Sequence, residues 1–95
     1  MKPFFIIIFL LCACATSAET KFEIPRSNIV QIKDPLSGRT YPLFIKLPRT
    51  YAANSNKTYP VIYLTDAMYS FQVVSGATRF AMNSAKMDEA IIVGI

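Results

Sequence analysis

The 95-residue sequence contains no histidine and no tryptophan, and its two cysteines, Cys12 and Cys14, both lie near the N-terminus. Because a Ser-His-Asp mechanism needs an imidazole as its general base, the absence of histidine excludes such a mechanism completed within these residues. Once residues 1–18 are removed, no thiol remains to form a disulfide or to bind a metal. We therefore expect neither a metal site nor a cofactor in the mature chain.

Clustered basic charge is also missing. The sequence carries 10 Lys and Arg against 6 Asp and Glu, a formal net charge of +4, and its basic residues are spread singly along the chain. Proteins that bind nucleic acid normally gather Lys and Arg on one face, where they displace counterions from phosphates. The pattern argues against nucleic acid as a partner, and it leaves the oligomeric state open.

The first 18 residues have the pattern of a signal peptide. Lys2 supplies a positive charge, and the uncharged run from Pro3 to Ala15 is shorter than the roughly 18 apolar residues of a membrane-spanning helix. The small residues 16–18 predict cleavage before Glu19, with export to the periplasm or the medium. A second interpretation stays open, because residues 11–14 resemble a lipobox that would place a lipid anchor on Cys14.

The mature chain begins with a polar arm over residues 19–28, which shows no clear periodicity. A β-hairpin follows it: Ile29 to Lys33 alternate, residues 34–38 have turn chemistry, and Arg39 to Leu47 alternate again. Pro42 has no amide hydrogen for a sheet ladder. It therefore places the second strand of the hairpin at an edge or at a bulge.

The remaining pattern predicts an α/β fold. Residues 60–65 form a short apolar run, which we expect to be a central strand covered on both faces. Apolar residues at three- and four-residue spacing predict a helix from about Ser70 to Lys86, and residues 90–95 repeat the buried-strand pattern. This order fits a right-handed parallel crossover. Because so small a sheet leaves one face and one edge bare, we interpret residues 29–95 as a partial domain, a fragment of a larger fold.

The loop after the strand at residues 60–65 is the leading candidate site, because ligands of open α/β sheets bind beyond the carboxyl ends of the strands. Amides that open a helix are unpaired and partly positive, so those of Ala67 and Met68 could stabilise a developing oxyanion. Asp66, Tyr69 and Phe71 are our candidates for a substrate pocket beside them. A purely structural role for Asp66, as the helix cap, stays open.

Three other motifs carry less information. Ser75 lacks the flanking glycines of a Gly-x-Ser-x-Gly elbow. The adjacent Asp88 and Glu89 are typical of a solvated turn, and residues 56–58 match a glycosylation sequon that matters only in a host that glycosylates exported chains. We assign no catalytic side chain among them.

Three segments carry a family resemblance: YPLFIKLP at residues 41–48, YPVIYLTD at residues 59–66 and AIIVGI at residues 90–95. Over about Ile29 to Ile95, the chain resembles the N-terminal third of the putative-esterase family of α/β hydrolases, which includes enterochelin esterase-like enzymes. The resemblance implies an exported serine hydrolase of carboxylic esters. It also implies that the amide of Ala67 or Met68 is one oxyanion donor, although family members usually have glycine where Ala67 stands.

In that family the nucleophile, its acidic partner and the histidine follow further along the chain, so the resemblance implies that these 95 residues are inactive alone. Two other interpretations stay open. The chain could belong to a noncatalytic binding or scaffolding domain that has kept the fold, or to a lipoprotein anchored at Cys14 that binds a partner. The acid and alcohol of the substrate are not determined by these residues.

Overall fold

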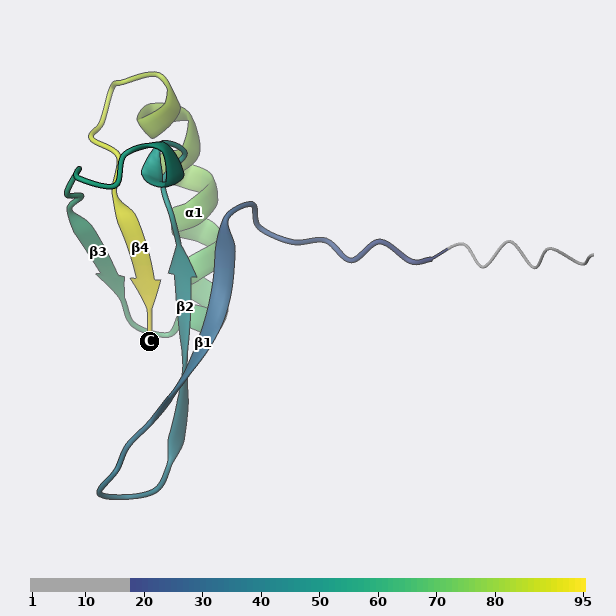
Figure 1. The fold of residues 1–95 in the computed structure, drawn as a ribbon. Coiled ribbons are helices and arrows are strands. Elements are labelled where there is room, and N and C mark those ends of the chain that lie inside the picture. The colour runs from purple at the N-terminus through teal and green to yellow at the C-terminus, as the bar shows by residue number, and fades with distance from the viewer. Residues whose placement is uncertain (1–17) are drawn as a thin grey trace, which may run out of the picture.

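The computed structural model describes residues 18–95. The predicted signal peptide, apart from its last residue, and the lipobox with Cys14 lie outside the described residues. Within residues 18–95, no helix is long and apolar enough to cross a membrane. The elements of this part of the chain are β1 (Ser27–Lys33), β2 (Thr40–Lys46), the short 3-10 helix η1 (Tyr51–Ala53), β3 (Val61–Leu64), α1 (Ala67–Asn83) and β4 (Ile91–Gly94) (Figure 1).

The four strands form one mixed sheet in the order β1-β2-β4-β3. β1 and β2 pair antiparallel as the predicted hairpin, and β2 also pairs antiparallel with β4. β3 and β4 pair parallel, and α1 connects them along one face of the sheet (Figure 1). The hairpin, the strand-helix-strand order and the α/β class are therefore confirmed.

The far end of the hairpin projects beyond the rest of the sheet (Figure 1). The Asp34 carboxylate fixes its turn by accepting hydrogen bonds from the Leu36 amide at 2.9 Å and the Ser37 hydroxyl at 2.7 Å. β2 pairs with β4 only over Phe44–Lys46, so Pro42 lies where β1 is the one neighbouring strand in the described chain. The prediction that Pro42 places this strand at an edge or at a bulge is wrong for β2 as a whole, which lies between β1 and β4 without a bulge in its register with β1.

The prediction of a central strand at residues 60–65, covered on both faces, is wrong for the described part of the chain. β3 lies at the edge of the sheet, and β4 takes the position between β2 and β3. On the face opposite α1, Val61 and Tyr63 are exposed. Both strands are apolar runs with apolar residues on both faces. Their order therefore depends on which of them pairs with β2, and a local pattern does not contain that information.

Helix α1 begins three residues before the predicted start at Ser70 and ends three residues before Lys86. Asp66 precedes it in the left-handed conformation, with φ 54° and ψ 50°, and makes no side-chain capping bond. At the other end, Ala85 is also left-handed, with φ 59°. Glycine normally marks the left-handed position that follows a helix, so Ala85 conceals the C-terminal boundary in the sequence.

The core lies between α1 and the sheet. Ala67, Phe71 and Ile92 are buried at its centre, and the rings of Phe71 and Phe44 pack with centroids 5.6 Å apart. Ile24 of the N-terminal arm also packs against this cluster. The arm is thus partly held by apolar contact, although its sequence shows no strand or helix period.

Candidate active site

The candidate site lies at the carboxyl ends of the parallel strands β3 and β4, where α1 begins (Figure 1). Backbone hydrogen bonds join the three segments: the Ile95 amide donates to the Leu64 carbonyl at 2.8 Å, and the Ala67 amide donates to the Ile95 carbonyl at 3.2 Å. This is the edge at which open α/β sheets bind ligands. The predicted loop is therefore tied to both strand ends.

Gly94 allows β4 to pass close to the first turn of α1. A Cβ atom added to Gly94 would lie 2.6 Å from the Ala67 Cβ and 3.3 Å from a ring carbon of Phe71. Any side chain at position 94 would therefore push the helix start away from the strand. The VGI segment carried the family resemblance in the sequence, and the structure gives the physical reason for its glycine.

The first four amides of α1 do not have equal partners. The Ala67 amide is already bonded to Ile95, and the Tyr69 and Ser70 amides both donate to the Asp66 carbonyl, at 2.9 and 3.0 Å. The Met68 amide has no acceptor within residues 18–95. At a helix N-terminus such a free amide carries partial positive charge. Ala67 and Met68 were the two predicted oxyanion donors. Of their amides, only that of Met68 has no acceptor within residues 18–95 and could donate to an oxyanion.

The structure separates the five predicted site residues into two groups. Asp66, Met68 and Tyr69 lie together at the surface, with the Tyr69 side chain 81% exposed. Ala67 and Phe71 face inward and belong to the core cluster. Phe71 therefore has a packing role under the site, and its contact with a substrate stays a prediction.

Ser70 stabilises the turn at the candidate site, a role that the sequence did not reveal. Its hydroxyl donates to the Thr65 carbonyl at 2.6 Å and lies 3.1 Å from the Asp66 carbonyl. These contacts hold the turn in which Asp66 adopts its left-handed conformation. A serine in the first turn of a predicted helix is too common to signal this role, because its partners are backbone atoms.

A second polar group lies at the opposite ends of these strands. The Glu89 carboxylate accepts hydrogen bonds from the Thr50 hydroxyl at 2.9 Å and from the Thr50 amide at 3.2 Å, and the Thr50 hydroxyl also contacts the Tyr59 hydroxyl at 2.9 Å. The Thr50 hydroxyl holds the pKa of Glu89 below its usual value. The prediction that Glu89 sits in a solvated turn misses this role, since Glu89 anchors the loop before β3 to the start of β4.

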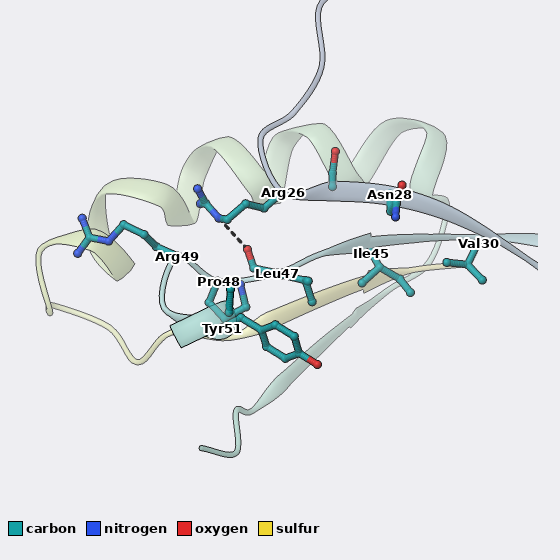
Figure 2. Close-up of a pocket in the computed structure, with 10 residues that line it drawn as sticks. Arg26, Asn28, Val30, Ile45, Leu47, Pro48, Arg49 and Tyr51 are labelled. Carbon is teal, nitrogen blue, oxygen red and sulfur yellow. Dashed lines mark hydrogen bonds between the residues drawn. The ribbon is translucent and has the colours of Figure 1, made fainter. Parts of the chain in front are cut away.

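A concavity of about 500 Å³ lies apart from the candidate site, beside β1, β2 and η1 (Figure 2). Its walls include Val30, Ile45 and Tyr51, and Arg26 closes one side by donating to the Leu47 carbonyl at 3.1 Å. It contains no carboxylate and none of the predicted site residues. Among residues 18–95, no three His, Cys, Asp or Glu side chains gather where they could hold a metal ion.

Comparisons with known proteins identify the family and the fold. A family model described as Putative esterase matches residues 36–95. The BES protein from Bacillus cereus superposes with a TM-score of 0.65 at 25% identity, over 80% of this chain and 29% of that one. An IroE-like serine hydrolase from Shewanella oneidensis gives a TM-score of 0.66 at 30% identity, over 73% of this chain and 22% of that one.

A ferulic acid esterase shares the fold at 22% identity, with a TM-score of 0.59, over 73% of this chain and 30% of that one. A comparison with proteins of curated function found no match. The chain thus spans less than a third of the length of these solved structures. With its mixed sheet and connecting helix, it forms part of an α/β-hydrolase fold.

Proposed function

Because the chain belongs to the putative-esterase family, we propose that it is the N-terminal part of a serine hydrolase that cleaves carboxylic esters. The substrate acyl group would pass to a serine and then to water. The chain has no histidine, so the serine, its histidine base and the acidic partner would all come from a later part of the polypeptide. Residues 18–95 would supply one oxyanion donor and part of the pocket wall.

The free Met68 amide is the observation that carries this proposal. In acyl transfer the carbonyl oxygen becomes negative, and N–H donors fixed in advance stabilise it. In α/β hydrolases one donor lies in the loop after an early strand, and the other follows the nucleophile. The amide of Met68 stands in such a loop without an acceptor in the described chain. Asp66 and Tyr69, exposed on the same turn, would contact the substrate.

A backbone donor is tested by removing its hydrogen. Met68→Pro deletes the amide hydrogen in the first helical turn, where proline is tolerated, and Met68→Ala is the matched control that keeps it. In the protein expressed from its full reading frame, we expect Met68→Pro to lower kcat for p-nitrophenyl acetate by about 100-fold. Met68→Ala should keep nearly full activity. If Met68→Pro and Met68→Ala unfold at the same urea concentration and have equal kcat values, the oxyanion donor is not the Met68 amide.

The hydrolase assignment itself is tested with the same substrate. A serine-directed phosphonate should abolish turnover by the full protein, and residues 19–95 alone should not exceed the buffer rate. A full protein that binds the ester without cleaving it would instead support the noncatalytic alternative. Turnover by residues 19–95 that the phosphonate blocks would contradict the assignment of the triad to a later part of the polypeptide.

We further propose that the protein is exported, with cleavage before Glu19. The support is the short apolar run and the small residues that precede that position. The mass of the mature protein distinguishes this from a lipid anchor. A chain starting at Glu19 supports soluble export to the periplasm or the medium, and a chain starting at a palmitate-labelled Cys14 contradicts it.

A further inference from the structure

Lys46 is a buried lysine on the face of β2 that packs under α1. Only 8% of its surface is exposed, and its ammonium donates to the Ser75 carbonyl at 3.1 Å. An ammonium has three donors, and the other two have no acceptor within residues 18–95. Burial, and then the positive charges of Arg26 and Arg79, lower the pKa of Lys46. A buried ammonium without a counterion is unfavourable.

Ser75, on α1 above Lys46, has a second unsatisfied group. Its side chain is only 2% exposed, and its hydroxyl has no hydrogen-bond partner in the described chain. Arg79 follows it by four residues and so lies on the same face of the helix. Buried polar groups in native proteins are nearly always paired, and each exception needs an explanation. Here the Ser75 hydroxyl has no partner, and the neighbouring Lys46 ammonium has an acceptor for one of its three donors.

Both side chains line a hollow of about 340 Å³ between α1 and the N-terminal arm. Its polar lining is Lys46, Gln72, Ser75 and Arg79, and its apolar lining is Phe22, Ile24 and Pro25 of the arm. No carboxylate lines it. The hollow therefore combines donors and positive charge on one side with apolar surface on the other.

Gly76 keeps this space open. It also lines the hollow, and a Cβ atom placed on it would meet no other atom within 4 Å. Its φ is not left-handed, so the backbone does not require glycine there. A larger side chain at position 76 would instead project into free space beside Ser75.

We propose that this hollow binds an amphipathic carboxylate, whose oxygens accept hydrogen bonds from the Lys46 ammonium and the Arg79 guanidinium. A carboxylate matches the planar fork of an arginine and pairs strongly with charged donors. An inorganic anion would satisfy the charges but would make no use of the apolar wall of Phe22 and Ile24. The ligand class is therefore an aromatic or aliphatic acid.

The site does not depend on the proposed ester hydrolysis. Ser75 follows Ala67 by eight residues, which is about 12 Å along the helix at 1.5 Å per residue. The head group would therefore lie about two turns from the Met68 amide. Binding of the acid and turnover of an ester can be measured separately, so that either can fail alone.

Benzoate is the probe, titrated calorimetrically into the protein expressed from its full reading frame at constant ionic strength. We expect saturable binding that Lys46→Met weakens about tenfold. Gly76→Leu keeps every charge but fills the hollow, and it should abolish binding. Lys33→Met, at an exposed lysine of the hairpin, is the matched control and should bind like the wild type.

Thermal unfolding of each variant shows whether it has folded. Lys46→Met should fold, since it removes an uncompensated buried charge. If Lys46→Met does not fold, Gly76→Leu tests whether the hollow binds the carboxylate. Wild-type protein that binds no benzoate would overturn the proposal, as would equal affinity in Lys46→Met or Gly76→Leu. Inorganic phosphate that binds as tightly as benzoate would overturn the amphipathic ligand class.

Discussion

Replacing Gly94 with alanine tests the contact on which the candidate site depends. The new methyl group would meet the Ala67 Cβ at 2.6 Å, well inside van der Waals contact, and a ring carbon of Phe71 at 3.3 Å. Ala67 has no side chain beyond Cβ that could rotate away. The helix start or the strand must therefore move, and the Met68 amide next in sequence moves with the helix.

The cost follows from overpacking. Adding one methyl group to a tightly packed core typically costs about 1–3 kcal/mol in the free energy of unfolding. The contact here joins Cβ to Cβ between two backbones, so we expect a value near the upper end, about 3 kcal/mol. Gly76→Ala is the control. It adds the same atom in open space on α1 and should raise stability by about 0.5–1 kcal/mol through helix propensity.

Urea unfolding of the full protein, followed by circular dichroism, measures both changes. Ala67→Gly in the Gly94→Ala background removes the Ala67 methyl group with which the new methyl group at position 94 would clash. The double variant should therefore be more stable than the sum of the single effects predicts, by about 1 kcal/mol or more. This prediction is refuted if Gly94→Ala unfolds at the same urea concentration as the wild type, or if the effects of the two substitutions are simply additive. Either result would mean that the close approach of β4 and α1 does not require glycine at position 94.

Two further predictions concern other parts of the fold. Phe71→Ala should lower the free energy of unfolding by about 3–5 kcal/mol, because Phe71 is buried against Phe44. Phe80→Ala, at an exposed position of the same helix, should change it by less than about 0.5 kcal/mol in the same urea experiment. The pKa of Glu89 is lowered in the folded chain by its bond from Thr50. Its stabilising contribution is therefore complete above the ordinary glutamate pKa of 4.5 and is lost as the pH falls through the folded value. Glu89→Gln should reduce the acid dependence of the melting temperature, and an unchanged dependence between pH 3 and 7 would contradict that role (about the range over which carboxylates titrate).

The element types were predictable because each depends on neighbours in the chain. Alternation in β1 and β2 and the three- and four-residue spacing in α1 reflect one face turned toward apolar contact. Element ends were less predictable. Ala85 adopts a left-handed backbone that its side chain does not favour, so the contacts around it fix the end of the helix.

The candidate site shows the same division. The loop at Asp66 was located correctly at the carboxyl end of a strand, because topology places every parallel strand end at the same edge. Which amide stays free was not predictable. That depends on the carbonyl of Ile95, which follows β4, lies 28 residues from Ala67 in the sequence and reaches it only in the folded sheet.

The sequence by itself determined the α/β class, the hairpin, the order of the elements and the family resemblance, since these follow from local periodicity and from short motifs. The tertiary structure decided the edge position of β3, the need for glycine at position 94, the burial of Phe71 and the enclosure of Lys46 beneath Ser75. Each of these is a contact between segments distant in the chain. Such contacts are set by packing in three dimensions, and no periodicity along one segment records them.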